Sequence, residues 1–133
     1  MIDQLSPHQL NQVMDIWLSS NLEAHSFIDP NYWKSQLPAV KDAIKAAEVY
    51  CFNDPDVIAF IGLDHNYIAG LFVDKNYRNQ GIGKKLLDYV KTNHNHLHLH
   101  AYTKNQGAIN FYQRNGFSII SQTDDEVRME WRR

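Results

Sequence analysis

The chain has little cysteine, glycine or proline and almost no net charge. Its 133 residues include 1 Cys, 6 Gly and 4 Pro, and the formal net charge is −2. A single cysteine, Cys51, cannot form an internal disulfide, which favours a reducing compartment and predicts a cytoplasmic location. A nucleic-acid-binding protein usually has a strongly basic face, so we expect no nucleic-acid partner.

Long apolar runs are also missing. No segment is long enough to span a bilayer, and Met1-Ile2-Asp3-Gln4 lacks the basic and then apolar pattern of a secretory signal. We therefore expect no membrane partner. Apolar residues are spread along the chain, which excludes a disordered protein and predicts a single domain spanning 1–133. The apolar last strand permits a homodimer, and the sequence leaves monomer and homodimer open.

Helix and strand patterns follow one another in an order typical of an α/β protein. A helix starts at Ser6-Pro7 and runs to about Asn21. A second helix spans roughly 31–47, and Pro38 predicts a kink or a break in it near Gln36-Leu37. Strands are expected next at 49–52, 57–63 and 67–73. They are followed by a helix ending near Asn93, a strand at 96–103, a short helix, and one or two strands ending with 126–131. The nearly continuous apolar run 67–73 is typical of a strand covered on both faces. The alternation in the second half implies parallel neighbours and a sheet covered by helices.

The most informative segment is 71–87, where an apolar strand, a polar turn and an amphipathic helix follow one another. Gly81 and Gly83 stand where the helix begins. Backbone N–H groups there have no partner within the helix, and the helix dipole favours an anion. We predict a pyrophosphate site formed by Arg78, Asn79, Gln80, Gly81, Ile82, Gly83 and Lys84.

Two other pyrophosphate motifs do not fit this segment. A Walker loop needs a glycine where Arg78 stands and a Ser or Thr where Lys85 stands. A dinucleotide fingerprint starting at Gly81 needs a small residue where Leu86 stands.

The pattern Arg-x-x-Gly-x-Gly from Arg78 to Gly83, after an apolar strand, resembles the coenzyme A pyrophosphate loop of the GNAT superfamily of N-acetyltransferases. Residues 105–117 also resemble that superfamily: an Asn ends a strand, a short helix carries Phe111-Tyr112, and Gly116-Phe117 begins the next strand. Gly116 stands where a left-handed helix cap is expected. Taken alone, the two aromatics would be core residues of a small helix. Within the superfamily, the chain is similar to the small bacterial YiaC- and YjaB-type acetyltransferases at segments 24–28 and 32–33 and at Pro38.

This resemblance covers nearly the whole chain and implies a fold and an activity. The implied fold is the GNAT fold of the α/β (α+β) class, with a mixed central sheet of six to seven strands and about four helices, splayed at the strand before the glycine loop. The implied activity is direct transfer from acetyl-CoA to an amine, with a protein lysine or peptide amine as the leading acceptor. The alternatives are acetylation of a small-molecule amine and a catalytically silent module that binds coenzyme A.

The resemblance also implies where the donor is held. Leu71, Phe72 and Val73 would offer backbone groups to the pantetheine amides, as an added strand does. The thioester carbonyl oxygen would lie near a backbone N–H of this strand, and Gly70 marks a possible bulge. Asn105 is in the family position for a pantetheine contact.

Two residues are candidates for proton transfer. Tyr112 is in the family position of the general acid, and a phenol of pKa ~10 can protonate a thiolate of similar basicity. Some relatives carry a Glu five residues before the motif Asn, where this chain has His100, and an imidazole can accept a proton near neutral pH. His100 is therefore a candidate base, or else an ordinary strand residue on a polar face. The other candidates are Asp64, His65, His25 and a water relay involving Tyr67.

The acceptor pocket is expected at loops 23–33 and 64–67, with a contribution from 123–125. Acidic and aromatic side chains there would suit a cationic amine. The candidate acceptor residues are His25, Phe27, Tyr32, Asp64, His65 and Tyr67. Trp33 is expected to pack in the core. His94, His96, His98 and His100 alternate on one strand, but no Cys or second cluster completes a ligand set, so we expect no metal.

Overall fold

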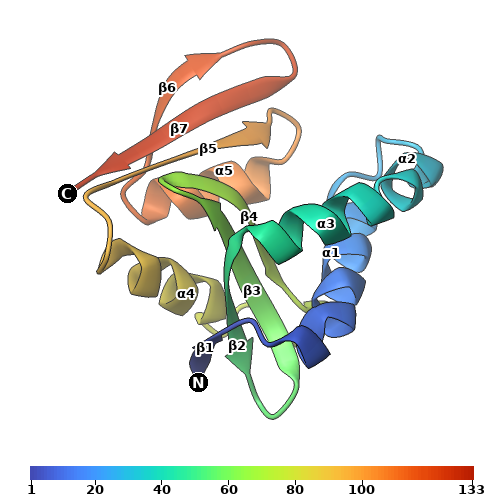
Figure 1. Ribbon diagram of the computed structural model, residues 1–133. Helices are drawn as coiled ribbons and strands as arrows, with labels where there is room; N and C mark the ends of the chain where they lie inside the picture. The colour runs from blue at the N-terminus through green and yellow to red at the C-terminus, as the bar shows by residue number, and fades with distance from the viewer.

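The computed structural model describes residues 1–133 and forms one seven-stranded sheet with helices on both faces (Figure 1). In chain order the elements are β1 (Ile2–Gln4), a 3₁₀ helix (Pro7–Gln9), α1 (Leu10–Ala24), α2 (Pro30–Ser35), α3 (Leu37–Ala46), β2 (Glu48–Asn53), β3 (Val57–Asp64), β4 (Tyr67–Val73), a second 3₁₀ helix (Lys75–Tyr77), α4 (Ile82–Lys91), β5 (His96–Tyr102), α5 (Gln106–Arg114), β6 (Ser118–Gln122) and β7 (Glu126–Arg132). None of the helices is long and apolar enough to cross a membrane.

The sheet is mixed, with the strand order β1-β2-β3-β4-β5-β7-β6. Every neighbouring pair is antiparallel except β4 and β5. These two parallel strands are in register at a single position, Tyr67 opposite His98, and they separate from there onward. The predicted splay at the strand before the glycine loop is therefore confirmed. It divides the sheet into β1–β4 and β5-β7-β6.

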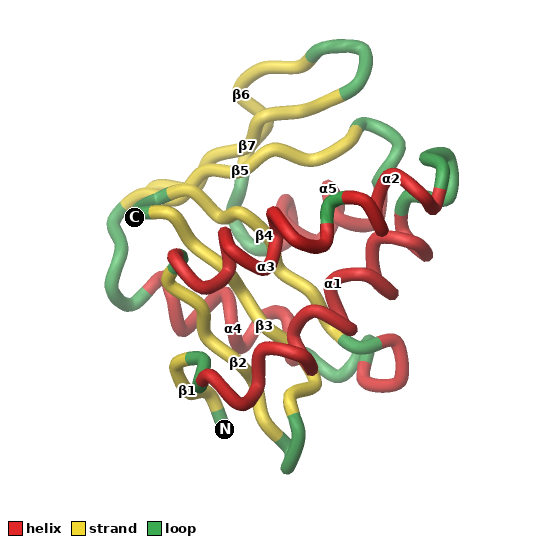
Figure 2. Tube along the Cα trace, turned by 45° about the vertical axis from the view of Figure 1, so that its right-hand side comes forward, coloured by secondary structure: helices red, strands yellow, loops and turns green.

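Two hydrophobic clusters lie on opposite faces of the sheet. Helices α1, α2 and α3 cover one face, and α4 and α5 cover the other; in Figure 2, α1 and α3 pass in front of the strands and α4 lies behind them. The α4–α5 cluster is the larger, with 16 buried residues, and it draws on strands from both halves of the sheet. The α4–α5 face is therefore the one that holds the two halves together.

The helices differ from the expectation in number and length. There are five α-helices rather than about four, because the kink or break expected near Gln36-Leu37 is a complete break. Gln36 ends α2 and precedes α3, with Pro38 in the first turn of α3. The first helix continues to Ala24, past the predicted end at Asn21, and α4 ends at Lys91 rather than Asn93. Trp33 is buried, as expected.

Strand β4 is not covered on both faces, contrary to the expectation from its apolar sequence. Only Ile68 is buried, Ala69 is exposed and the remaining residues are half-buried. The reason is the splay, because β5 moves away where a neighbouring strand would otherwise shield the edge of β4. The expected bulge at Gly70 is present: Gly62 pairs with Gly70, but Leu63 pairs with Ile68, so Ala69 is the extra residue.

Candidate active site

The opening between β4 and β5 exposes backbone groups of β4. Asp74 N–H donates to the Ile58 carbonyl at 2.8 Å. This bond shows which of the facing residue pairs of β3 and β4 are hydrogen-bonded to each other. Because hydrogen-bonded and non-hydrogen-bonded pairs alternate, Phe72 bonds to β3, whereas Leu71 and Val73 turn their N–H and C=O groups toward the opening. Of the three strand residues predicted to hold the donor, two thus offer backbone groups.

The glycine loop ends with unpaired donors at the start of α4. Gly81 is the residue before the helix, with φ +77°, and no side chain caps the helix there. A Cβ at Gly81 would meet nothing within 4 Å, so the glycine is required by its left-handed backbone and not by space. Asn79 is also left-handed, with φ +64°. The loop thus directs the uncapped N–H groups of α4 outward, as an anion site requires.

The cationic side chains of the loop already have partners in the protein. The Arg78 guanidinium pairs with the Glu23 carboxylate, and its Nε donates to the Val73 carbonyl at 3.3 Å. Lys84 Nζ is 2.6 Å from the Asp88 carboxylate. The fixed part of the predicted pyrophosphate site is therefore its backbone.

Tyr112 lies on α5, in the cluster that joins the two halves of the sheet. Only 8% of the residue is exposed, and its ring packs edge-on against Phe111 and Phe117. Burial raises the pKa of the Tyr112 hydroxyl well above its ordinary value, with a smaller contribution from Tyr67. The phenol consequently keeps its proton at neutral pH, as a general acid must.

His100 and Tyr67 meet across the splay. His100 Nδ1 is 3.3 Å from the Tyr67 hydroxyl, and the imidazole is exposed rather than covered by a helix. Burial raises the pKa of Tyr67, and Glu126 adds to the shift. Tyr67 is thus within hydrogen-bond reach of the candidate base on β5 and near enough to Tyr112 to contribute to the shift of its pKa.

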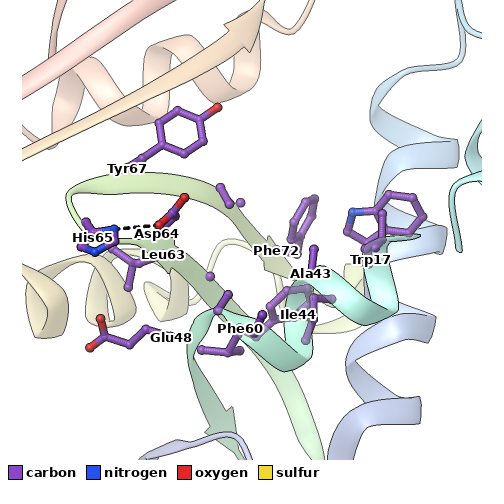
Figure 3. A pocket seen from close by; sticks show the side chains of 17 residues that line it. Trp17, Ala43, Ile44, Glu48, Phe60, Leu63, Asp64, His65, Tyr67 and Phe72 are labelled. Carbon is purple, nitrogen blue, oxygen red and sulfur yellow. Dashed lines mark hydrogen bonds and ion pairs between the residues drawn. The ribbon is translucent and has the colours of Figure 1, made fainter. Parts of the chain in front are cut away.

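The candidate acceptor residues do not form one pocket. Asp64, His65 and Tyr67 line a largely apolar cavity of 720 Å³ between α3 and the β3–β4 hairpin. Figure 3 shows Trp17 at one end of this cavity and Asp64 and His65 at the other. His65 is almost fully exposed and pairs with Asp64 at 2.8 Å.

Phe27 lines a second hollow, of 470 Å³, between the α1–α2 loop and the β6–β7 turn. The acidic residues Asp125 and Glu126 lie on its other side. Tyr32 lines neither hollow; it is exposed and packs its ring against Trp33.

His25 is inside the protein and not on a pocket wall. It is 9% exposed, and both of its ring nitrogens have partners: Nδ1 lies 3.1 Å from Asn21 Oδ1, and Nε2 lies 3.3 Å from Asn105 Nδ2. Burial lowers the pKa of His25. In this arrangement, His25 can therefore neither contact an acceptor nor serve as its base.

Sequence reasoning missed two residues of this region, Asn21 and Tyr102. The spacing of four residues between Asn21 and His25 on one helix was a signal that the two side chains meet. Tyr102 lies two residues after His100, so it shares its strand face, and its ring is 4.8 Å from that of His25. No group of three or more His, Cys, Asp or Glu side chains is arranged to hold a metal ion.

Comparisons with known proteins agree with this geometry. Residues 45–119 match a family model described as an acetyltransferase (GNAT) domain. The chain is 38% identical over 123 residues to the peptidyl-lysine N-acetyltransferase YiaC of Escherichia coli (strain K12), covering 90% of this chain and 84% of that protein.

Two solved structures share the fold. The solution structure of apo YjaB from Escherichia coli has a TM-score of 0.86 at 18% identity, covering 98% of this chain and 96% of that one. The PaiA N-acetyltransferase from Thermoplasma acidophilum in complex with coenzyme A has a TM-score of 0.87 at 20% identity, covering 100% and 98%.

The loop geometry predicts that Gly81→Asp weakens coenzyme A binding. Asp tolerates a left-handed backbone better than most residues, so the fold should survive, while its carboxylate repels the pyrophosphate at the helix start. Calorimetry should show an affinity lower by about tenfold or more, equivalent to at least ~1.4 kcal/mol. Asn93→Asp places the same charge beyond the other end of α4 and should bind like the wild type. Equal affinity of folded Gly81→Asp and the wild type would contradict the assignment.

Proposed function

The chain belongs to the GNAT family of acetyltransferases, and we propose that it transfers the acetyl group of acetyl-CoA to lysine side chains of proteins or peptides. The observation that carries the proposal is the opening between β4 and β5, where Val73 at the end of β4 lies close to Gly83 at the uncapped start of α4. The named activity of the 38% identical relative supports a lysine acceptor. Residues 1–133 act as one domain in this proposal, in the cytoplasm, without nucleic acid or membrane, as a monomer or homodimer.

The donor is held by backbone groups at two places. The pyrophosphate binds the N–H groups at Gly81, Ile82 and Gly83, where the helix dipole adds to the attraction. The pantetheine lies along β4 and bonds to the outward groups of Leu71 and Val73. Asn105 contributes a side-chain contact from the opposite side of the opening.

The acceptor approaches through the hollow that the α1–α2 loop and the β6–β7 turn line. The 470 Å³ hollow combines the acidic Asp125 and Glu126 with the rings of Phe27 and Tyr102, and this combination suits a cationic side chain. Lys104, whose ammonium lies 5.1 Å from the centre of the Phe27 ring, occupies a position that a substrate lysine would compete for. His100 and Tyr102 share the strand face that leads from this hollow toward the splay.

The chemistry is direct transfer. The neutral amine attacks the thioester carbonyl, forming the C–N bond, while an N–H of β4 donates to the developing oxyanion. His100, assisted by Tyr67, takes the proton that the ammonium must lose. The C–S bond then breaks, and Tyr112 protonates the departing thiolate. The attacking nitrogen is positively charged once the C–N bond has formed, and the proton that it then loses passes through water to the Tyr112 phenolate. Of the two protons that the ammonium loses, one thus leaves with His100 and the other replaces the proton given to the coenzyme A thiol.

A small-molecule amine is the second candidate acceptor, and the 720 Å³ cavity favours it. Its volume falls in the range of small-molecule sites, and its walls are mostly apolar with Glu48 and Asp64 at the rim. An apolar amine would fit this cavity better than the open acidic hollow. The two candidates therefore differ in which hollow the acceptor enters.

A turnover assay with acetyl-CoA tests the proposal. Lysine-containing peptides should be acetylated with a higher kcat/KM than polyamines, free amino acids or apolar amines, and mass spectrometry should place the acetyl group on the lysine ε-nitrogen. Preference for apolar amines would move the acceptor to the 720 Å³ cavity. Tight coenzyme A binding with no transfer to any amine would identify a silent binding module.

Tyr112→Phe should bind acetyl-CoA normally and turn over more slowly. Only the hydroxyl is removed, and general acid catalysis typically contributes ~10²–10⁴-fold. Because burial raises the pKa of Tyr112, the wild type should not lose this acid below pH ~10. Tyr89→Phe, on the exposed side of α4, is the matched control and should keep the wild-type kcat. An unchanged kcat for Tyr112→Phe with an efficient peptide would remove Tyr112 from the mechanism.

His100→Gln should remove the acidic limb of the kcat/KM profile or lower activity at every pH, while acetyl-CoA affinity stays the same. The reason is that Gln keeps a polar group near Tyr67 but cannot take a proton. His100→Glu should retain activity and move the limb to lower pH, because carboxylates ordinarily titrate near 4. His8→Gln, exposed in the turn before α1, is the control. A His100→Gln profile that overlays the wild type would leave proton removal to water relayed through Tyr67, or to Asp64 or His65.

A further inference from the structure

A continuous chain of hydrogen bonds connects α1 to the start of α5 through His25. Asn21 Nδ2 donates to the Trp17 carbonyl at 2.8 Å, and Asn21 Oδ1 lies 3.1 Å from His25 Nδ1. His25 Nε2 lies 3.3 Å from Asn105 Nδ2, and Asn105 Oδ1 accepts from the Ala108 backbone N–H at 3.1 Å. This series of hydrogen bonds begins at Trp17, which is 88 positions before Asn105 in the sequence. It ends at Asn105, the residue that caps α5.

The direction of every bond in this chain follows from chemistry. Because Asn21 uses its amide nitrogen on a carbonyl, its oxygen faces His25, which must therefore carry its hydrogen on Nδ1. A neutral imidazole then has a lone pair on Nε2, and Asn105 must point its nitrogen there. The Asn105 side-chain oxygen accepts from the Ala108 N–H, and one of its two amide N–H groups donates to His25. The other N–H remains for another partner.

The surroundings keep His25 neutral and fixed in place. Its ring stacks on Trp33 at 5.3 Å and meets Tyr102 at 4.8 Å between centroids. Asn21 is 4% exposed, so the partner of His25 Nδ1 is shielded from bulk water. Burial lowers the pKa of His25, which agrees with the neutral form that the bonds require.

We propose that His25 is a positioning residue, which holds the Asn105 amide in the single orientation that both caps α5 and presents an N–H to the pantetheine. This inference rests on the proposed function, because it assigns the remaining N–H to the donor. Turning the amide over would set its oxygen against the His25 lone pair and its nitrogen against the Ala108 N–H. Both hydrogen bonds would be lost together. Since α5 also carries Tyr112 two turns later, the same contact orders the start of the helix that bears the general acid.

Three substitutions separate positioning from simple packing. His25→Leu keeps an apolar side chain between Trp33 and Tyr102 but loses both hydrogen bonds. His25→Gln keeps a carbonyl oxygen that can accept from Asn105. Asn105→Asp still caps α5, because Asp is a favoured N-cap residue, but it offers no N–H to the pantetheine and accepts from His25 instead. His8→Leu is the exposed control.

Kinetics with acetyl-CoA and an acceptor peptide give the first readout. His25→Leu and Asn105→Asp should lower kcat/KM by about 10–10²-fold, the loss expected when a reacting group is displaced by around one ångström. His25→Gln and His8→Leu should stay within about threefold of the wild type. A folded His25→Leu with wild-type kcat/KM, or a His25→Gln as impaired as His25→Leu, would overturn the inference.

Nitrogen NMR of the His25 ring gives a readout that needs no turnover. At pH 7 the wild type should show a neutral ring protonated on Nδ1, and Asn105→Asp should show a doubly protonated ring, because a neighbouring carboxylate favours the charged form. A wild-type ring protonated on Nε2, or an unchanged ring in Asn105→Asp, would overturn the inference. The NMR measurement tests the role of His25 even if the wild type acetylates no amine. In that case the proposed function fails, and the NMR result still decides whether His25 orients Asn105.

Discussion

The separation of β4 from β5 is the feature on which the rest of the site depends. These strands form the only parallel pair in the sheet and are in register at one position, so the edge of β4 beyond Tyr67 has no partner. An open edge inside a sheet is costly unless something completes it, because unpaired backbone groups must find partners. The larger core spans both halves through α4 and α5 and joins them on one face, beside the opening. An extended ligand with amide groups is the natural occupant of such an edge.

In the proposed function, the two ends of the opening bind different parts of acetyl-CoA. At the α4 end, uncapped N–H groups and the helix dipole suit a doubly charged pyrophosphate. Toward Tyr67, a buried phenol and an exposed imidazole face the point where the sheet divides. The distribution of burial matches the proposed chemistry: Tyr112, the proposed acid, is shielded and keeps its proton, and His100, the proposed base, is exposed to water.

Much of this arrangement could be predicted from the sequence, because its signals are local. The strand, glycines and helix of 71–87 predicted the loop, Pro38 predicted the break between α2 and α3, and Gly116 has the positive φ that its position implied. The splay was implied by the resemblance to the GNAT superfamily. What could not be predicted depends on contacts distant in sequence. The pairing of Arg78 with Glu23 and of His25 with Asn105, and the division of the acceptor residues between two hollows, arise only when α1 is placed against the sheet. The apolar run of β4 was misread because its sequence does not show that its neighbour departs.

Amide hydrogen exchange on β4, with and without coenzyme A, tests the central claim most directly. The N–H groups of Leu71 and Val73 face the opening, whereas the N–H of Phe72 is already bonded to β3. Coenzyme A should therefore slow exchange at Leu71 or Val73, and at the start of α4, while leaving Phe72 nearly unchanged. Binding that leaves Leu71, Val73 and the α4 start exchanging as before would contradict the claim that the donor completes the open edge of β4.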